Sequence, residues 1–396
     1  MPAASPPAPG LRQLAPFAGL SASYFAHIGF FNPYLPLWLK HLGLPVTVIS
    51  VLIATQSFTR VFAPYAWGML SDRTGERVRL LRLSGLVAVI ASLGLWWSGG
   101  PVWIGLVLLV MFTHTSSMMS LTEAAMAQLV AGDWGRYGRV RLWGSVGFMA
   151  TVVVAGAWFE RFGMEHFPGW TLFTLVLVLG CTLWLPDVRE APAPAGHRHE
   201  AILPVLREPA VRWFFASLLF HITAHFAVYG FISLYLDARG YSKAMIGGLW
   251  AVSVAVEILW FFWQGRLIGH LSMPRWLVVC GAATALRMAL LATAADWLAA
   301  LVVAQVLHAL SFATHHTAAI AMVTRHFPGR LRGRGQALFT VVGYGVGGVT
   351  GVLAGGQVVA RFGYVPMYAA ATVLGMAATY CAWRVLKLES AAAANP

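Results

Sequence analysis

The stretch from residue 46 to residue 79, VTVISVLIATQSFTRVFAPYAWGMLSDRTGERVR, sets a pattern that the rest of the chain repeats. Up to residue 69 it is apolar, apart from hydroxyl and amide side chains and one cation, Arg60. A helix of about 20 predominantly apolar residues crosses a bilayer, so this part predicts a transmembrane helix. The charged residues from Asp72 to Arg79 then predict a turn in water.

Eleven further apolar runs follow the same pattern. The complete set lies at about 14–38, 46–69, 80–98, 102–129, 140–159, 167–185, 211–236, 244–268, 275–294, 297–322, 336–359 and 364–386. The chain of 396 residues is 59% hydrophobic and 10% charged, whereas a soluble domain has about 25% charged residues. The sequence therefore predicts an all-α membrane protein with twelve transmembrane helices, and it excludes soluble globular, disordered and fibrous classes.

The runs fall into two groups of six. We expect a cytoplasmic N-terminal tail at 1–13, an N-terminal six-helix bundle at 14–185, a cytoplasmic linker at 186–210, a C-terminal six-helix bundle at 211–387 and a cytoplasmic tail at 388–396. The halves also repeat each other. At one common offset Gly43 matches Gly240 and Gly68 matches Gly265. At the same offset Arg60 falls on Glu257, so the two repeats place opposite charges at equivalent positions.

The distribution of cations predicts the topology. Twenty Lys and Arg residues lie in the termini, the linker and the loops on the same side, and five lie on the other side. Loops rich in Lys and Arg stay in the cytoplasm, so both termini and the linker are expected there, in the cell inner (plasma) membrane. The formal net charge of +13 then reflects topology and contact with anionic lipid, and no nucleic-acid partner is expected.

The turn Gly68-Met-Leu-Ser-Asp72-Arg73-Thr-Gly75-Glu-Arg77 resembles the helix 2–3 signature of the major facilitator superfamily. This resemblance assigns Gly68, Asp72, Arg73, Gly75 and Arg77 to a gating motif. It implies two pseudo-symmetric six-helix bundles, with helices 1, 2, 4, 5, 7, 8, 10 and 11 lining a central cavity. Transport between two such repeats uses a site near the middle of the membrane. The chain contains no GxxxxGK[ST] loop for ATP.

Other segments look like the phenylpropionate-permease branch, which is similar to the lactose-permease type of H⁺ symporter. They are Leu121-Thr122-Glu123, Tyr137-Gly138-Arg139-Val140-Arg141-Leu142-Trp143-Gly144-Ser145, Tyr229-Gly230-Phe231, Gly240-Tyr241-Ser242, Leu249-Trp250 through Glu257, and Gln305-Val306-Leu307-His308. The resemblance implies a secondary transporter, not an enzyme, that works by alternating access without a cofactor, the proton being the coupling ion.

Four charged side chains lie in or near the ends of the apolar runs: Arg60, Glu123, Glu257 and Arg287. A charge at a helix centre costs about 2.5–3.5 kcal/mol on insertion scales, so each is expected to face a cavity or a partner. In lactose-type permeases a helix 8 carboxylate, a helix 9 arginine and a helix 10 histidine share one site. Glu257, Arg287 and His308 match these roles. The chain departs from those permeases one turn later, where residues 309–312 hold no acid.

We therefore expect Glu257 to carry the proton, with assistance from His308. Arg60 or Arg287 is expected to bind a substrate carboxylate. Glu123 and Arg141 resemble the sugar-orienting pair of the permeases, and a gate ion pair is the alternative interpretation for them.

Uncharged residues complete the expected binding site. Asn32, followed by Pro33 and Pro36, is expected to interrupt the first helix, and Tyr229-Gly230 marks the aligned place in the seventh. Discontinuous helices at matching places in both halves indicate a binding site. Trp250 and Tyr229 could stack on a planar substrate. No metal site is expected, because His221 and His225 have no third ligand at a supporting spacing.

These observations predict proton-coupled uptake of a small organic solute such as an aromatic carboxylate. The expected partners are this small-molecule substrate and membrane lipid, and the protein is expected to be a monomer. A sugar or nucleoside/H⁺ symporter, which would depend on Glu123 and Arg141, is one alternative. A proton-driven drug or metabolite exporter is another. A sensor or membrane enzyme is the third, and it lacks a soluble domain and a clear nucleophile motif.

Overall fold

The computed structural model describes residues 11–97, 99–130, 134–186 and 202–394. In these ranges twelve helices are long and apolar enough to cross a membrane, which confirms the predicted number and the all-α fold. Most of the expected N-terminal tail and most of the expected linker lie outside the described residues.

The N-terminal half contains six spans. They are α1 (Leu11–His41), α2 (Val46–Thr74), α3 (Arg77–Ser92) with the 3₁₀ turn η1 (Leu93–Trp96), α4 (Gly100–Val130), α5 (Trp134–Phe162), and η2 (Met164–His166) with α6 (Phe167–Trp184). Each span extends past its apolar run at one end or at both, because a helix continues into the interface until a capping residue ends it. Gly75, for example, ends α2 in the left-handed conformation at a φ of 68°.

The C-terminal half begins after the short helix α7 (Leu203–Arg207) and repeats this order. Its first three spans are α8 (Pro209–Ala238), α9 (Lys243–Leu267) with η3 (Ile268–His270), and α10 (Met273–Thr293). The next span joins α11 (Leu298–Val306), the π-helix η4 (Ala309–Thr314) and α12 (His315–His326). After η5 (Gly329–Leu331), α13 (Arg332–Phe339), the π-helix η6 (Thr340–Gly347) and α14 (Gly348–Phe362) form another span, and α15 (Tyr364–Ala394) is the last.

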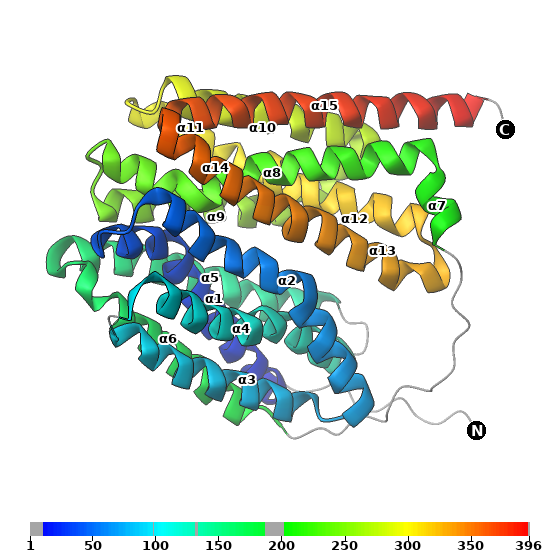
Figure 1. Ribbon diagram of the computed structural model, residues 1–396. Helices are drawn as coiled ribbons and strands as arrows, with labels where there is room; N and C mark the ends of the chain where they lie inside the picture. The colour runs from blue at the N-terminus through cyan, green and yellow to red at the C-terminus, as the bar shows by residue number, and fades with distance from the viewer. Residues whose placement is uncertain (1–10, 98, 131–133, 187–201, 395–396) are drawn as a thin grey trace, which may run out of the picture.

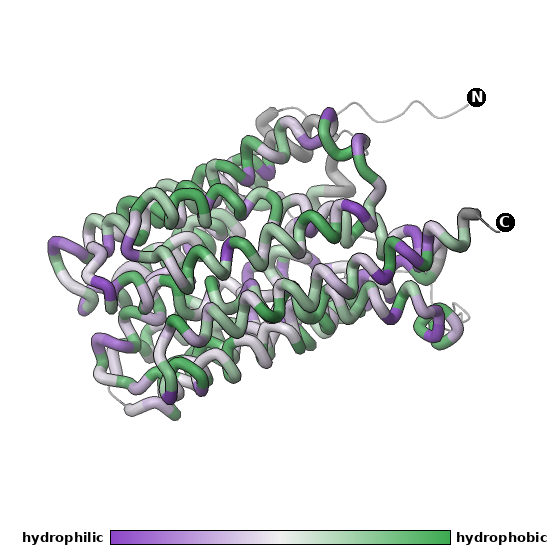
Figure 2. The backbone as a smooth tube through the Cα atoms, turned by 90° about the horizontal axis from the view of Figure 1, so that it is seen from above, coloured by the Kyte–Doolittle hydropathy of each residue, from purple (hydrophilic) through white to green (hydrophobic). Residues whose placement is uncertain are grey.

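The two halves form separate bundles that lie side by side (Figure 1). They meet mainly where α5 packs on α9 and α2 packs on α14. We call the end of the molecule with the α1–α2 turn the Lys40 end, and the end with the α2–α3 turn the Asp72 end. Figure 1 shows the bundles close together toward the Lys40 end and diverging toward the Asp72 end. Figure 2 shows hydrophobic residues along the helices and many of the hydrophilic ones near their ends, as a bilayer requires.

The expected interruption of the first helix is wrong. α1 is continuous from Leu11 to His41 and includes Pro16, Pro33 and Pro36. A proline removes one backbone donor, and packing against neighbouring helices compensates for this in a membrane bundle. α8 is likewise unbroken through Tyr229-Gly230. The irregular backbone lies instead in η4 and η6, two π-helical segments of the C-terminal half.

Polar contacts join the bundles at the Lys40 end. Lys40 Nζ lies 2.7 Å from Asp237 Oδ2, and the Lys243 N–H donates to Glu160 Oε2 at 2.7 Å. The Tyr34 hydroxyl lies 3.2 Å from the Lys243 carbonyl oxygen. The bundles are therefore held together on the side of the cavity nearest the α1–α2 turn.

Candidate substrate site

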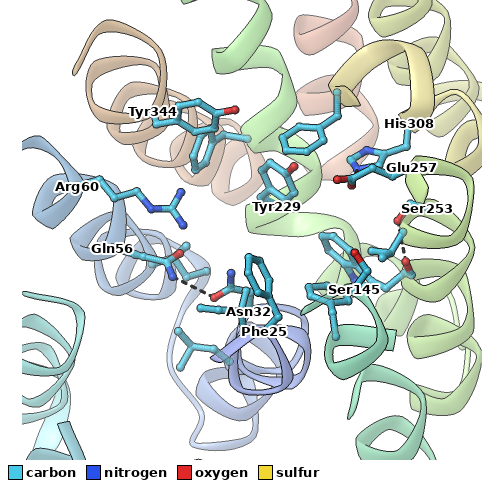
Figure 3. Close-up of a pocket in the computed structure, with 18 of the residues that line it drawn as sticks. Phe25, Asn32, Gln56, Arg60, Ser145, Tyr229, Ser253, Glu257, His308 and Tyr344 are labelled. Carbon is cyan, nitrogen blue, oxygen red and sulfur yellow. Dashed lines mark hydrogen bonds and ion pairs between the residues drawn. The ribbon is translucent and has the colours of Figure 1, made fainter. Parts of the chain in front are cut away.

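A cavity of about 320 Å³ lies between the bundles, and side chains from both halves line it (Figure 3). The N-terminal half contributes Phe25, Ile28, Asn32 and Leu35 from α1, Ile53, Gln56 and Arg60 from α2, Phe112 from α4, and Arg141, Ser145 and Phe148 from α5. The C-terminal half contributes Phe226 and Tyr229 from α8, Trp250, Ser253, Val254 and Glu257 from α9, His308 and Phe312 around η4, and Tyr344 from η6. These are the spans that the resemblance implied.

Helical periodicity explains which side chains reach the cavity. On α9 the lining residues Trp250, Ser253 and Glu257 recur at the spacing of one helix face. The lining residues Ile53, Gln56 and Arg60 have the same spacing on α2, and they align with the α9 set at the repeat offset. Equivalent faces of the two repeats thus form opposite walls of the cavity.

Aromatic rings cover much of the wall. Tyr229 and Trp250 lie parallel, with ring centroids 6.0 Å apart and an interplanar angle of 13°. Phe312 stacks on His308 at 4.9 Å and 5°. The Trp250 indole N–H donates to Ser233 Oγ at 3.2 Å, which fixes the ring. Flat, preoriented rings of this kind favour a planar apolar ligand group.

Arg60 extends from α2 into the cavity (Figure 3). Its guanidinium makes no hydrogen bond or ion pair with any residue that the structure describes, and the side chain is half-buried. A guanidinium matches a carboxylate through two parallel hydrogen bonds. Arg60 is therefore available for an anionic group of a ligand.

Glu257, His308 and Arg287 form a chain of contacts on the opposite wall. Glu257 Oε2 lies 3.5 Å from His308 Nε2, and His308 Nδ1 lies 3.0 Å from Arg287 Nη1. Because a guanidinium only donates hydrogen bonds, His308 Nδ1 must be the acceptor. A neutral His308 ring then carries its hydrogen on Nε2, directed at the Glu257 carboxylate.

Arg287 does not line the cavity. Its side chain is fully buried behind His308, and it also donates to Gln305 Oε1 at 3.0 Å and to Ser311 Oγ at 3.3 Å. The expectation that Arg287 contacts substrate therefore finds no support in this geometry. Its contact with His308 agrees with the expectation that Glu257, Arg287 and His308 lie together at one site.

Arg141 and Glu123 form a long ion pair, with Arg141 Nε 4.0 Å from Glu123 Oε1. The Arg141 guanidinium lies 4.2 Å from the centroid of the Phe25 ring. Arg141 lines the cavity, whereas Glu123 is not among the described residues that do. The geometry thus brings together seven of the expected site residues and leaves two outside. The seven are Asn32, Arg60, Arg141, Tyr229, Trp250, Glu257 and His308.

The motif between α2 and α3 lies apart from the cavity. Arg77 is largely buried, with Nη2 3.6 Å from Asp72 Oδ1 and Nε donating to Ser71 Oγ at 3.2 Å. Gly75 takes its positive φ where α2 ends, and its N–H donates to the Ser71 carbonyl at 2.8 Å. Gly68 and Arg73 lie on the adjoining part of α2, where Arg73 is exposed. The motif shapes the Asp72 end of the N-terminal bundle.

Sequence reasoning missed several lining residues. Gln56 donates to Asn32 Oδ1 at 3.1 Å, and Ser145 and Ser253 add hydroxyls. Gln56 and Ser253 each lie four residues before a predicted site residue, so helical spacing could have revealed them. Tyr344 lies in a π-helix, whose altered periodicity leaves no comparable signal.

The buried histidines form a stack behind His308. The His221 and His315 rings lie 3.5 Å apart and nearly parallel, and His225 lies 5.5 Å from His308. No cluster of His, Cys, Asp or Glu in the described part of the chain could hold a metal ion.

Comparisons with known proteins agree with this architecture. The model of the MFS_1 like family matches residues 20–370. The "Probable 3-phenylpropionic acid transporter" of Escherichia coli (strain K12) is 27% identical over 339 residues, which cover 82% of this chain and 85% of that protein. The "Maltose permease" of Geobacillus stearothermophilus is 26% identical over 353 residues, which cover 85% of this chain and 86% of that protein.

Solved structures share the fold. A mutant form of the nucleoside transporter NupG superposes with a TM-score of 0.83 at 16% identity, covering 95% of this chain and 99% of that one. A POT family transporter in complex with a thioalcohol-conjugated peptide gives a TM-score of 0.75 at 10% identity, with 96% of each chain covered.

Proposed function

The chain belongs to the MFS_1 like family of membrane transporters, and from this premise we propose that it takes up small aromatic carboxylates together with protons by alternating access. The observation that carries the proposal is Arg60, which has no partner among the described residues, in a cavity with aromatic walls, opposite the Glu257–His308 pair. An aromatic acid needs these two features, a cation for its carboxylate and flat apolar surfaces for its ring. The printed name of the Escherichia coli relative, a 3-phenylpropionic acid transporter, supports the same substrate class.

The proton is assigned to Glu257. Its side chain is 21% exposed and borders the cavity, so water in the cavity can deliver or remove a proton. His308 stabilises the ionised carboxylate through Nε2–H, while Arg287 fixes the orientation of the ring from behind. A second proton on His308 would have to reside on Nδ1, against the Arg287 guanidinium. Glu257 is therefore the proton carrier, and His308 and Arg287 are positioning residues.

The topology indicates the side of the membrane to which the cavity opens. We place the Asp72 end in the cytoplasm of a bacterial cell, because loops rich in Lys and Arg gather there. Described examples are Arg73, Arg79, Arg266, Arg325 and Arg332. The polar contacts at the Lys40 end then close the cavity toward the outside. The arrangement corresponds to the state that exchanges substrate with the cytoplasm.

A sugar or nucleoside symporter remains the second candidate. Arg141 lines the cavity and forms an ion pair with Glu123, and these two residues resemble the sugar-orienting pair of the permeases. The maltose permease and NupG are also similar to this chain. The amides of Asn32 and Gln56 could bind hydroxyl groups of such a substrate.

A transport assay separates these candidates. The purified full-length protein is reconstituted into liposomes, and a pH gradient, acidic outside, drives uptake of labelled 3-phenylpropionate, maltose or uridine. The proposal expects saturable uptake of the aromatic acid above that of protein-free liposomes, which account for passage of the neutral acid through lipid. Uptake of only maltose or uridine would favour the second candidate, and accumulation only under the opposite gradient would indicate an exporter.

Replacing the unpaired cation tests the carboxylate site. Arg60→Gln is expected to weaken binding of 3-phenylpropionate by roughly 10- to 150-fold, because hydrogen bonds to charged groups contribute about 1.5–3 kcal/mol. Binding is measured on the purified protein by isothermal titration. The control is Arg161→Gln, which removes an exposed cation from the last turn of α5. Equal affinity of Arg60→Gln and the wild type would show that the carboxylate binds elsewhere.

A further inference from the structure

Two charges of opposite sign face each other across the cavity. Arg60 comes from α2, and Glu257 comes from the equivalent position of α9 in the other repeat. Figure 3 shows both side chains directed into the same space from opposite walls. Among the described residues that line the cavity, Glu257 is the only carboxylate.

The other ionisable groups near the cavity have fixed roles. Arg141 from α5 pairs with Glu123, and Arg287 from α10 is hydrogen-bonded behind His308. Tyr229 from α8 and Tyr344 from η6 are phenols, which stay neutral at physiological pH. On α12, the His316 ring centroid lies 6.4 Å from that of Phe312. We therefore assign the change of charge during loading to Glu257, which gains a proton, while Arg60 stays a cation and gains a counter-anion.

Building on the proposed function, we propose that transport is electroneutral and carries one proton on Glu257 and one monocarboxylate on Arg60. With both ligands bound, the cavity has the same net charge as with neither, because the proton adds one positive charge and the carboxylate adds one negative charge. A carrier with only one of the two ligands bears an extra charge in apolar surroundings, which is costly. The half-loaded carrier therefore reorients more slowly than the empty or the fully loaded carrier. This difference in rate couples transport of the carboxylate to transport of the proton.

The same charge balance defines the substrate class. A dicarboxylate would bring a second negative charge that no free cation among the described lining residues matches. An aromatic alcohol or amide would leave Arg60 without a counter-ion. We therefore expect aromatic monocarboxylates to be transported, and their dicarboxylate and amide analogues to be rejected.

The experiment varies the pH gradient and the membrane potential independently in proteoliposomes of the wild-type protein, with labelled 3-phenylpropionate as the probe. Each pH unit should raise the accumulation ratio about tenfold, as expected for one proton per substrate, and the protein should speed the approach to this ratio. A potential of about 60 mV set by K⁺ and valinomycin, which changes the distribution of one charge tenfold, should leave the ratio unchanged. Protein-free liposomes give the background.

The outcomes separate this inference from the proposed function. If an inside-negative potential of about 60 mV raises accumulation about tenfold, two protons accompany each anion and the inference is wrong, although proton-coupled uptake stands. If the inside-negative potential lowers accumulation, the anion crosses without a compensating proton, and the inference is also wrong. If no aromatic acid enters faster than it enters protein-free liposomes under any pH gradient, the proposed function itself fails.

Glu257→Gln provides a second test, because the amide imitates the protonated carboxyl permanently. The loaded variant has the net charge of the loaded wild type, so exchange of internal for external substrate should persist. The empty variant leaves the Arg60 charge unbalanced, so net uptake should fall by at least about tenfold. Glu165→Gln, an exposed carboxylate in η2, is the matched control. Retained exchange also shows that the variant is folded, and unchanged net uptake by Glu257→Gln would overturn the inference.

Discussion

At the scale of the residue, the position of each charge decides its role. Arg60 and Arg287 are both cations inside apolar helices. Arg60 borders the cavity and has no partner in the part of the chain that the structure describes, whereas Arg287 is fully buried and donates to three neutral acceptors. Charged residues within a bilayer either pair or line a pathway. Arg60 can therefore bind and release a ligand, whereas Arg287 holds the His308 ring in one orientation.

The aromatic wall gives a prediction at this scale. Tyr229→Leu removes the ring that lies parallel to Trp250, and an aromatic contact contributes about 0.5–1.5 kcal/mol beyond its buried area. We expect 3-phenylpropionate to bind roughly 2- to 13-fold more weakly, measured by isothermal titration. Tyr229→Phe keeps the ring and should retain the affinity. A loss of equal size in both variants would assign the effect to the hydroxyl instead.

At the scale of the element, π-helical segments create contacts that an α-helix does not allow. At the end of η4 the His315 N–H bonds to the carbonyl of Leu310, five residues earlier. In an α-helix it would bond to Ser311, four residues earlier. The Ser311 carbonyl instead accepts a hydrogen bond from His221 Nε2 at 2.7 Å. Such segments often occur at functional sites, and η4 directly follows His308.

The contact between α5 and α9 gives a prediction for this scale. Gly247 on α9 approaches α5 so closely that an added Cβ would lie 2.5 Å from the Val152 carbonyl oxygen. Gly247→Val should therefore disfavour closure of the Lys40 end by about 1–3 kcal/mol, roughly 5- to 150-fold in the equilibrium. We expect faster labelling of a cysteine placed at the cavity residue Leu35 by an impermeant maleimide from that side.

The adjacent glycine supplies the control. A Cβ at Gly248 would have no described atom within 4 Å, so Gly248→Val should leave the labelling rate close to that of the parent. Equal rates for Gly247→Val and the parent would mean that this contact does not limit opening.

At the scale of the whole molecule, the repeat places a pair of opposite charges at the Lys40 end as well. Lys40 and Asp237 occupy positions related by the repeat offset and form an ion pair between the bundles. Gly68 and Gly265, equivalent positions toward the Asp72 end, would meet no described atom within 4 Å if a Cβ were added. The contacts between the bundles therefore hold one end closed.

Breaking this ion pair should favour opening of the Lys40 end. Exposed pairs contribute about 0–1 kcal/mol, so Asp237→Asn is expected to speed labelling of the cysteine at Leu35 by up to roughly fivefold. Salt should reduce the difference by screening the pair in the parent. Asp296→Asn is the control, because it breaks an ion pair with Arg239 that lies within the C-terminal half. An equal effect of both variants would argue for a general charge effect.

The sequence alone determined the number of spans, their division into two related halves and the equivalence of Arg60 and Glu257. It could do so because a bilayer admits few solutions for an apolar run of about 20 residues, and because a repeat keeps its register. Seven of the expected site residues line the cavity. The sequence could indicate them because polar groups within membrane spans face the protein interior or a cavity.

Only the tertiary structure decided which polar groups meet. The rotation of each helix depends on packing against its neighbours, which the order of residues does not reveal. This rotation buried Arg287 behind His308, left Glu123 outside the lining and brought Gln56 to Asn32. The same packing kept α1 continuous through its prolines and placed π-helices in two other spans. The sequence supplied the charges, and packing decided which of them remained free to bind a ligand.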